Sequence, residues 1–254
     1  MIYIAILGHL VSDFALQDDS MIKRKKNSAL LGNAIHSSSV AGITAAMFFG
    51  FYLWNNLLSE TALIDCAKIF GYIFATHLVI DIIKYNINKE SLLVDVIDQA
   101  LHITAIFLLF KFIPVTQIPI PQAIALLLRM LIVIVFCIWV GDIFIRQTLG
   151  NHEGKRESHK ENINHTGSTI GRIERFIMLV FMLLGYQLGI ITVFAIKSII
   201  RFQEYKKGDN DYYIFGNLLS LLVVIISYCL WLGLSYGFFH SGGSVMQVFN
   251  TSIK

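Results

Sequence analysis

The chain has 254 residues, of which 56% are hydrophobic and only 15% charged, whereas a soluble domain carries about 25% charged residues. Its mean hydropathy is +0.66, and apolar runs near the roughly 20 residues that cross hydrocarbon recur along it. These features exclude an ordinary soluble protein. The sequence predicts an all-α fold, a polytopic transmembrane helical bundle of about seven to eight segments. We expect residues 1–254 to form one integral-membrane domain.

The cysteines and the total charge exclude further classes of protein. Cys66, Cys137 and Cys229 are far apart, so no spacing indicates a disulfide framework or a thiolate metal site. The formal net charge is +3, but the basic residues follow the expected sidedness of a membrane protein. Nothing in their arrangement indicates nucleic-acid binding.

Five apolar helices are expected in the first part of the chain. Residues 1–17 should form a retained helix, because no basic region precedes them as it would in a signal peptide. Further helices are expected at residues 28–58, 62–85, 92–113 and 122–147. All three prolines lie within residues 114–121 and interrupt the chain between the last two helices.

The second part of the chain contains the only long polar stretch, at about residues 150–171. We expect a mobile cytoplasmic loop there. Residues 172–201 are apolar but interrupted between Gly185 and Gly189, which predicts either two short helices or one crossing followed by a re-entrant piece. A last span is expected at residues 212–239.

The distribution of charge predicts one orientation. The basic run Lys23–Lys26 marks the cytoplasmic side, and with this choice only four of the 20 Lys and Arg residues fall elsewhere: Lys68, Lys111, Arg129 and Lys254. Both termini would lie outside if the chain crosses eight times.

Three histidine–aspartate pairs lie inside these apolar helices. They are His9 with Asp13, His77 with Asp81, and Asp98 with His102. Residues four apart share one face of a helix. The helices that carry the first two pairs, 1–17 and 62–85, run inward. The helix that carries the third pair, 92–113, runs outward, which explains why that pair is reversed. At about 1.5 Å rise per residue, the pairs lie at similar estimated distances from the cytoplasmic ends of their helices, and His36 lies at a similar distance on its own helix. The sequence predicts a layer of histidines above a layer of aspartates.

Imidazoles and carboxylates together favour a divalent metal ion, with zinc expected first and manganese or iron as alternatives. The candidate ligands are His9, Asp13, His36, His77, Asp81, Asp98 and His102. One of Asp13, Asp81 and Asp98 would act as the catalytic base. Asp95 and Gln17, each one turn from a pair, are further candidate ligands or orienting groups.

Two alternative roles for the pairs stay open. The pairs could simply hold the helices together through interhelical hydrogen bonds, although such bonds contribute only about 0.6 kcal/mol on average in a membrane. The same residues could also form a proton or ion pathway, because intramembrane ionisable groups mark such paths.

A second polar region is expected at the cytoplasmic leaflet. Residues 167–171 carry glycines and capping residues where we expect a helix to begin, and helix N-termini favour anions. The expected contacts to a lipid head group are Arg172, Arg175, Lys197 and Arg201. Alternatively, these cations only obey the positive-inside rule. Arg129 and Asp142 are expected to be isolated structural partners.

The motifs also carry a resemblance. His9-Leu-x-x-Asp13-Phe-x-x-Gln17, His77-x-x-x-Asp81 and Asp98-Gln-x-x-His102 resemble a family of bacterial inner-membrane proteins catalogued as a domain of unknown function. Two later motifs, Gly167-x-x-Ile-Gly171-x-x-Glu174-Arg175 and Ala195-x-Lys197-Ser-x-x-Arg201-Phe, resemble it too. The resemblance implies an integral inner-membrane protein and brings no established activity. By residue type alone, the pattern is also similar to membrane-bound metal-dependent hydrolases.

The functional hypothesis is therefore a membrane-embedded, metal-dependent hydrolase of a lipid or lipid-linked phosphate or ester near the cytoplasmic leaflet. One alternative is an ion- or proton-coupled transporter, favoured by the polar cluster and the interrupted helix but opposed by the absence of an evident inverted repeat. Another is a membrane sensor or assembly protein that signals through residues 150–171.

Overall fold

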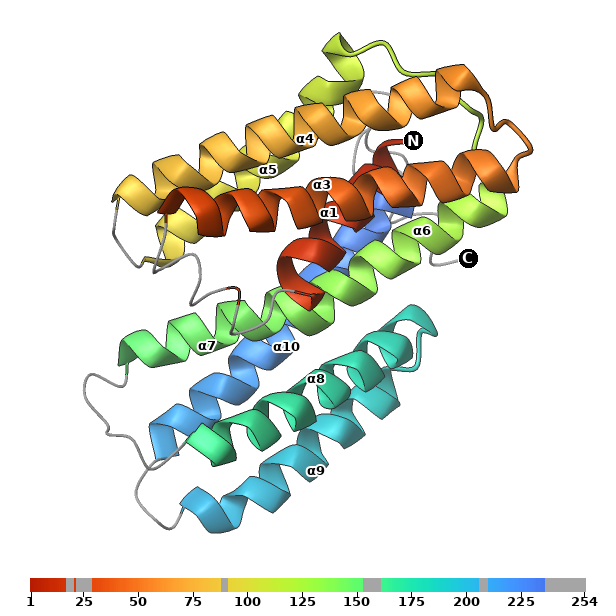
Figure 1. Ribbon diagram of the computed structural model, residues 1–254. Coiled ribbons are helices and arrows are strands. Elements are labelled where there is room, and N and C mark those ends of the chain that lie inside the picture. Colours follow the sequence, from red (N-terminus) through yellow and green to blue (C-terminus); the bar gives the residue numbers. More distant parts are fainter. Residues whose placement is uncertain (17–20, 22–28, 88–90, 153–160, 206–209, 236–254) are drawn as a thin grey trace. The chain divides into compact units, whose positions relative to one another are not determined.

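A computed structural model describes residues 1–16, 21, 29–87, 91–152, 161–205 and 210–235. Every element within these residues is a helix (Figure 1). The chain divides into two compact units, Met1–Leu128 and Arg129–Lys254. The sequence expectation of one integral-membrane domain stays a prediction.

Unit 1 contains a short broken helix and three long helices. The short helix is α1 (Ile2–Leu10), continued by the π-helical turn η1 (Val11–Ala15). The long helices are α3 (Ala29–Trp54), α4 (Glu60–Ile87) and α5 (Leu92–Phe112). These bounds lie close to the four helices expected from the sequence. Gln17 and the basic run Lys23–Lys26 lie outside the described residues.

Buried apolar residues lie on one side of the polar pair on each of α1, α4 and α5. Ile4 precedes the polar pair on α1, and Ile69 and Ile73 precede it on α4. On α5 the order is reversed, with Ile106 and Leu109 after the pair. An apolar core therefore fills one half of the unit, where these residues pack with Val40, Phe48 and Tyr52 of α3. The polar residues gather in the other half.

A buried aspartate fixes the far end of this core. Asp65 Oδ2 accepts hydrogen bonds from the Thr116 backbone N–H at 2.8 Å and from the Tyr52 hydroxyl at 3.4 Å. Lys68 Nζ contacts Asp65 Oδ1 at 3.3 Å and donates to the Pro114 carbonyl at 3.0 Å. These contacts tie the proline-rich connection after α5 to helices α3 and α4.

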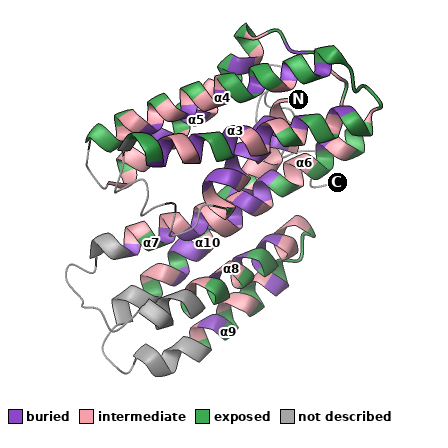
Figure 2. Cartoon of the chain, viewed as in Figure 1, coloured by how far each residue is buried: buried purple, intermediate pink, exposed green. Residues whose placement is uncertain are grey.

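The outer faces of the long helices are apolar. The exposed positions of α4, green in Figure 2, include Phe70, Val79 and Ile83. Exposed apolar side chains on long helices are typical of surfaces that meet lipid.

Helix α6 (Gln122–Val135) begins at the end of unit 1 and continues into unit 2. It is followed by a second π-helical turn, η2 (Phe136–Val140), and by α7 (Gly141–His152). Unit 2 then contains α8 (Glu161–Leu183), α9 (Gln187–Tyr205) and α10 (Asn210–Ser235).

The expected seven to eight membrane segments are not supported. Five helices within the described residues are long and apolar enough to cross a membrane: 30–54, 60–87, 92–112, 122–149 and 214–235. The apolar helices at 2–15 and 187–199 are shorter. The sequence count was too high because short apolar helices and the half-polar α8 were counted as crossings.

Part of the polar region expected as a loop at residues 150–171 is helical. Helix α7 continues to His152 and α8 already begins at Glu161, while residues 153–160 lie outside the described part. The expectation that a helix begins at residues 167–171 is therefore wrong, and no helix terminus at these residues supports the expected anion site. Ser168 and Arg172 both donate to Asp142 of α7, and these tertiary contacts favour helix over loop here.

The interruption near Gly185 is confirmed as a break between α8, which ends at Leu183, and α9, which begins at Gln187. Gly185 has a φ of +69°, a left-handed conformation that glycine adopts without penalty. The backbone N–H of Tyr186 donates to the Phe181 carbonyl at 2.8 Å, as in a glycine-terminated helix end.

A buried histidine–aspartate cluster as a candidate metal centre

The structure brings together all seven residues expected to form the polar site. His9 and Asp13 come from α1 and η1, His36 from α3, His77 and Asp81 from α4, and Asp98 and His102 from α5; all are buried. The ring centroids of His77 and His102 are 3.9 Å apart, those of His36 and His77 5.0 Å, and those of His9 and His102 5.2 Å. The three sequence pairs and His36 form one cluster.

The π-helical turn η1 positions Asp13 within this cluster. A π turn inserts an extra residue into helical pairing, and such turns are frequent at functional sites. The Ser12 hydroxyl donates to the Gly8 carbonyl and so bonds to the backbone of the preceding turn. Asp13, in the middle of η1, is buried and points its carboxylate at His36.

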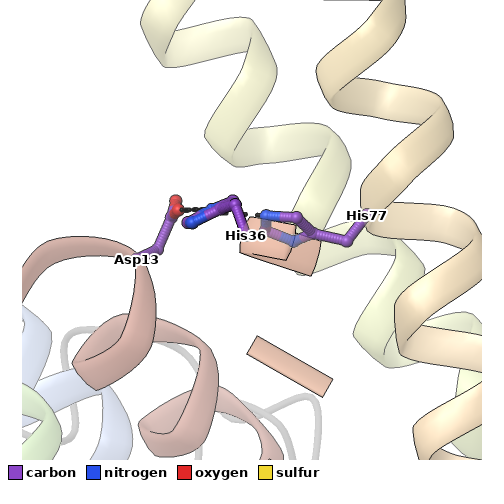
Figure 3. Close-up of side chains that lie close together, drawn as sticks. All are labelled: Asp13, His36 and His77. Carbon is purple, nitrogen blue, oxygen red and sulfur yellow. Dashed lines mark hydrogen bonds and ion pairs between the residues drawn. The ribbon is translucent and has the colours of Figure 1, made fainter. Parts of the chain in front are cut away.

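Two groups of three side chains have the spacing of metal ligands. One is Asp13, His36 and His77, shown in Figure 3 with His36 between the other two, and the second is His77, Asp81 and His102. Within each group, the ligand-type atoms lie within 4.8 Å of one another. His77 belongs to both groups.

Two imidazole nitrogens in these groups, those of His77 and His102, lack hydrogen bonds from the described residues. His77 Nε2 and His102 Nε2 are buried and make no hydrogen bond within the described chain. His102 Nε2 lies 3.4 Å from Asp81 Oδ1, and His77 Nε2 lies 3.7 Å from Asp81 Oδ2. Neighbouring ligands around a tetrahedral zinc ion, with bonds of about 2.0–2.2 Å, lie about 3.3–3.6 Å apart. The separations therefore fit a shared ion better than direct hydrogen bonds.

Gln99 connects the separate pairs. Its side-chain amide donates to Asp13 Oδ2 at 2.9 Å and to Asp98 Oδ2 at 3.3 Å. Because carboxylates accept hydrogen bonds, these contacts orient the amide, and its oxygen accepts from His9 Nε2 at 3.2 Å. His9 Nε2 therefore carries a proton. His9 lies beside the two ligand groups and suits an orienting role.

Lys84 lies at the other edge of the cluster. Its ammonium group contacts Asp95 Oδ1 at 2.7 Å and Asp98 Oδ2 at 2.8 Å. Asp95 is thereby paired with Lys84. The second oxygen of Asp98, Oδ1, is buried 3.5 Å from His102 Nε2 and makes no hydrogen bond within the described residues.

Gln99 and Lys84 belong to the site although neither was expected there from the sequence. Gln99 follows Asp98 directly, and Lys84 lies one turn after Asp81. The signal for both was their position beside an intramembrane aspartate, since a buried carboxylate requires polar partners.

A small cavity adjoins the histidines. It has a volume of about 10 Å³ and is lined by His9, His77 and His102 together with Tyr72, Thr76 and Ala105, among others. That volume is close to the roughly 10–15 Å³ that one water molecule requires. The cluster thus has room for one small ligand beside the imidazoles.

The basic residues expected at a lipid head group lie in unit 2 and are largely paired. Asp142 accepts from Arg172 Nη2 at 2.7 Å, from Arg175 Nη2 at 3.3 Å and from Ser168 Oγ at 2.8 Å. Arg175 is buried and also donates to the carbonyls of Cys137 and Ile138 in η2, both at 3.1 Å. Asp142 is therefore the centre of a polar network rather than an isolated residue.

The remaining expected cations differ in their surroundings. Lys197 is buried and forms a 2.6 Å ion pair with Glu174. The side chain of Arg201 lies outside the described part of the structure. Arg172 keeps about a third of its side chain exposed, so of the three cations whose side chains are described it is the most open to an anion. Contact between a lipid head group and these residues stays a prediction.

The first half of the chain matches a known protein family. A family described as "protein of unknown function (DUF3307)" matches residues 1–131. The chain belongs to this DUF3307 family. The matched residues cover unit 1 and every residue of the histidine–aspartate cluster, whereas the C-terminal motifs at residues 167–175 and 195–202 lie outside them.

The other two comparisons add no relative. No curated protein and no solved structure matches the chain.

Proposed function

We propose that this protein is a membrane-embedded, metal-dependent hydrolase that acts on a lipid or lipid-linked phosphate or ester near the cytoplasmic leaflet of the bacterial inner membrane. The observation that carries the proposal is the pair of buried imidazole nitrogens, on His77 and His102, that face carboxylate oxygens at 3.4–3.9 Å and receive no hydrogen bond from the described part of the chain. Leaving such groups unpaired in a membrane interior is costly, and a bound cation would satisfy them.

Five residues supply the proposed ligands: Asp13, His36, His77, Asp81 and His102. Zinc is the favoured ion because it accepts mixed imidazole and carboxylate ligands at these spacings, with manganese and iron as alternatives. His36 Nε2 now bonds Asp13 Oδ1 at 2.8 Å, so metal binding there would release a proton.

The neighbouring residues have distinct roles in the proposed hydrolysis. A divalent ion would polarise a phosphoryl or carbonyl oxygen and acidify a bound water. Asp98 Oδ1 is the carboxylate oxygen available to take the proton of the attacking water, since Oδ2 is held by Lys84 and Gln99. Water then forms the new bond to phosphorus or carbon, and the lipid oxygen leaves with a proton.

Metal content tests the proposal first. Full-length protein, purified in detergent and incubated with zinc, manganese or iron and then desalted, should retain about one ion per chain. His77→Ala should abolish retention because His77 belongs to both ligand groups. Asp65→Asn is the matched control, as it removes a buried intramembrane charge outside the cluster, and should retain the ion. A wild-type protein that retains no ion would refute the metal centre.

Activity is tested on the metal-loaded protein. Short-chain phosphatidic acid and short-chain phosphatidylcholine in mixed micelles present a phosphate monoester and carboxylic esters, and released phosphate or fatty acid is measured. Asp98→Asn should remove most turnover while ion retention persists, because Asp98 lies outside both ligand groups. Normal turnover in Asp98→Asn would exclude its role as the base.

Proton-coupled transport remains a second candidate, favoured by one observation. A continuous series of contacts runs from Asp95 through Lys84 to Asp98 and His102, that is, from the start of α5 into the cluster. Such series occur in proton pathways. Proton flux into liposomes that is lost in Asp81→Asn, together with absent hydrolysis, would favour transport.

A further inference from the structure

An apolar groove lies between α4 and α5 on the outside of the cluster. It is open along one side and has a volume of about 370 Å³, within the roughly 300–1,000 Å³ usual for small-molecule sites. Its lining is almost entirely apolar and includes Ala75, Val79 and Ile80 from α4, and Leu101, Ala105 and Leu108 from α5.

The two threonine hydroxyls of this groove already donate within their own helices. The Thr76 hydroxyl donates to the Tyr72 carbonyl at 2.9 Å, and the Thr104 hydroxyl donates to the Ala100 carbonyl at 2.7 Å. Their methyl groups therefore remain for contact. Ala75 and Ala105 add little side-chain volume on either wall, so the groove has the chemistry of a hydrocarbon site.

The groove adjoins the polar cluster. Three of its residues, Tyr72, Thr76 and Ala105, also line the small cavity against His9, His77 and His102. A molecule in the groove would therefore have its apolar part between α4 and α5 and one end beside the imidazoles. Such a molecule must be apolar along most of its length and polar at one end.

We propose that the groove between α4 and α5 binds one hydrocarbon chain of a membrane lipid and places the polar end of that lipid beside His9, His77 and His102. Both helices have the length and composition of membrane spans, so lipid chains are the ligand present at highest concentration along them. Binding of the hydrocarbon chain depends on the groove alone, whereas hydrolysis of the bound lipid rests on the proposed function.

Photo-crosslinking in lipid nanodiscs tests chain binding. Full-length protein is placed in phosphatidylethanolamine and phosphatidylglycerol nanodiscs that contain a trace of phosphatidic acid with a diazirine in its acyl chain. The labelled residues are located by mass spectrometry. We expect labelling to concentrate on Val79, Leu101 and Leu108 rather than on exposed apolar residues outside the groove, such as Phe70 and Ile83.

Two matched variants separate groove binding from general lipid contact. Ala75→Phe fills the groove, and we expect loss of most of the labelling there. Ala100→Phe adds the same side chain at an exposed position of α5 that does not line the groove, and labelling should be unchanged. Even labelling of all outer faces, or labelling that survives Ala75→Phe, would overturn the proposal.

Two further measurements complete the test. Zinc retention by Ala75→Phe should equal that of the wild type, because Ala75 lies outside the ligand groups. Groove labelling without any bound metal in the wild type would leave chain binding intact and refute the hydrolase. Efficient oxidative crosslinking of Val79→Cys between two copies in nanodiscs would show that a second chain covers the groove, and would overturn lipid binding there.

Discussion

Gln99 shows how one uncharged residue can determine the arrangement of a charged cluster. Its amide has two donors and one acceptor site, and it bonds two carboxylates and one imidazole. By accepting from His9 it fixes the proton on that ring, and by donating to Asp13 it leaves the other carboxylate oxygen for His36. The residues around a metal ion orient its ligands in this way.

Substitution of Gln99 should therefore weaken metal binding without unfolding the protein. Gln99→Glu places a third acceptor against Asp13 and Asp98 and removes both donors. We expect zinc affinity to fall about 10- to 100-fold, the usual effect of changing a residue that orients metal ligands, as measured by competition with a chelating dye. Gln117→Glu, the same change outside the cluster, should have no effect. Unchanged affinity in Gln99→Glu would remove Gln99 from the site.

At the scale of the helices, close contact between α1 and α3 positions half of the cluster. A Cβ atom at Gly8 would lie 2.7 Å from Thr44 Oγ1 and 3.1 Å from Thr44 Cα, so the two backbones approach closely at this position. Small residues permit such contacts between membrane helices. Because Gly8 immediately precedes His9, this contact also sets the distance of His9 and Asp13 from His36.

Gly8→Ala should force α1 away from α3. Overpacking of this kind costs about 1–3 kcal/mol, and the displacement of Asp13 should lower zinc retention as well as the midpoint of thermal unfolding in detergent. Gly42→Ala is the matched control, since a Cβ atom there has no neighbour within 4 Å, and both quantities should stay at or above the wild-type value. Equal behaviour of the two variants would contradict this role of Gly8.

At the scale of the whole molecule, the two units carry separate polar networks. The cluster of unit 1 lies within the residues that match the DUF3307 family. Asp142 of unit 2 instead holds Ser168, Arg172 and Arg175 together across α7 and α8. The carbonyls of η2 that bind Arg175 belong to a π turn, where the regular helical hydrogen bonding is interrupted.

Asp142→Asn should destabilise unit 2 and leave metal binding intact. Removing one partner of a buried ion pair costs about 3–5 kcal/mol, and Arg175 would lose its carboxylate. We expect faster proteolysis of the C-terminal half and unchanged zinc retention. Arg146→Ala removes a mostly exposed partner of the same carboxylate and should change neither. Loss of zinc in Asp142→Asn, with normal expression, would show that the two networks depend on each other.

The sequence alone predicted the helical class, the bounds of most helices in unit 1 and the meeting of the three histidine–aspartate pairs. It could do so because apolar length defines a membrane helix, and because four-residue spacing and charge sidedness define the face and direction of each pair. The break before α9 was also predictable, because glycine interrupts a helix where the chain needs a left-handed conformation, as Gly185 adopts here.

Other features were decided only by the tertiary structure. Residues 161–171 are helical although their polar composition indicated a loop, since Ser168 and Arg172 gain a buried acceptor, Asp142, from another helix. The orienting role of His9 depends on its hydrogen bond to Gln99, and the position of Lys84 depends on its hydrogen bond to Asp98. Both partners lie on another helix. The three histidine–aspartate pairs specified which residues meet; only their packing specified which nitrogen and oxygen atoms remain for an ion.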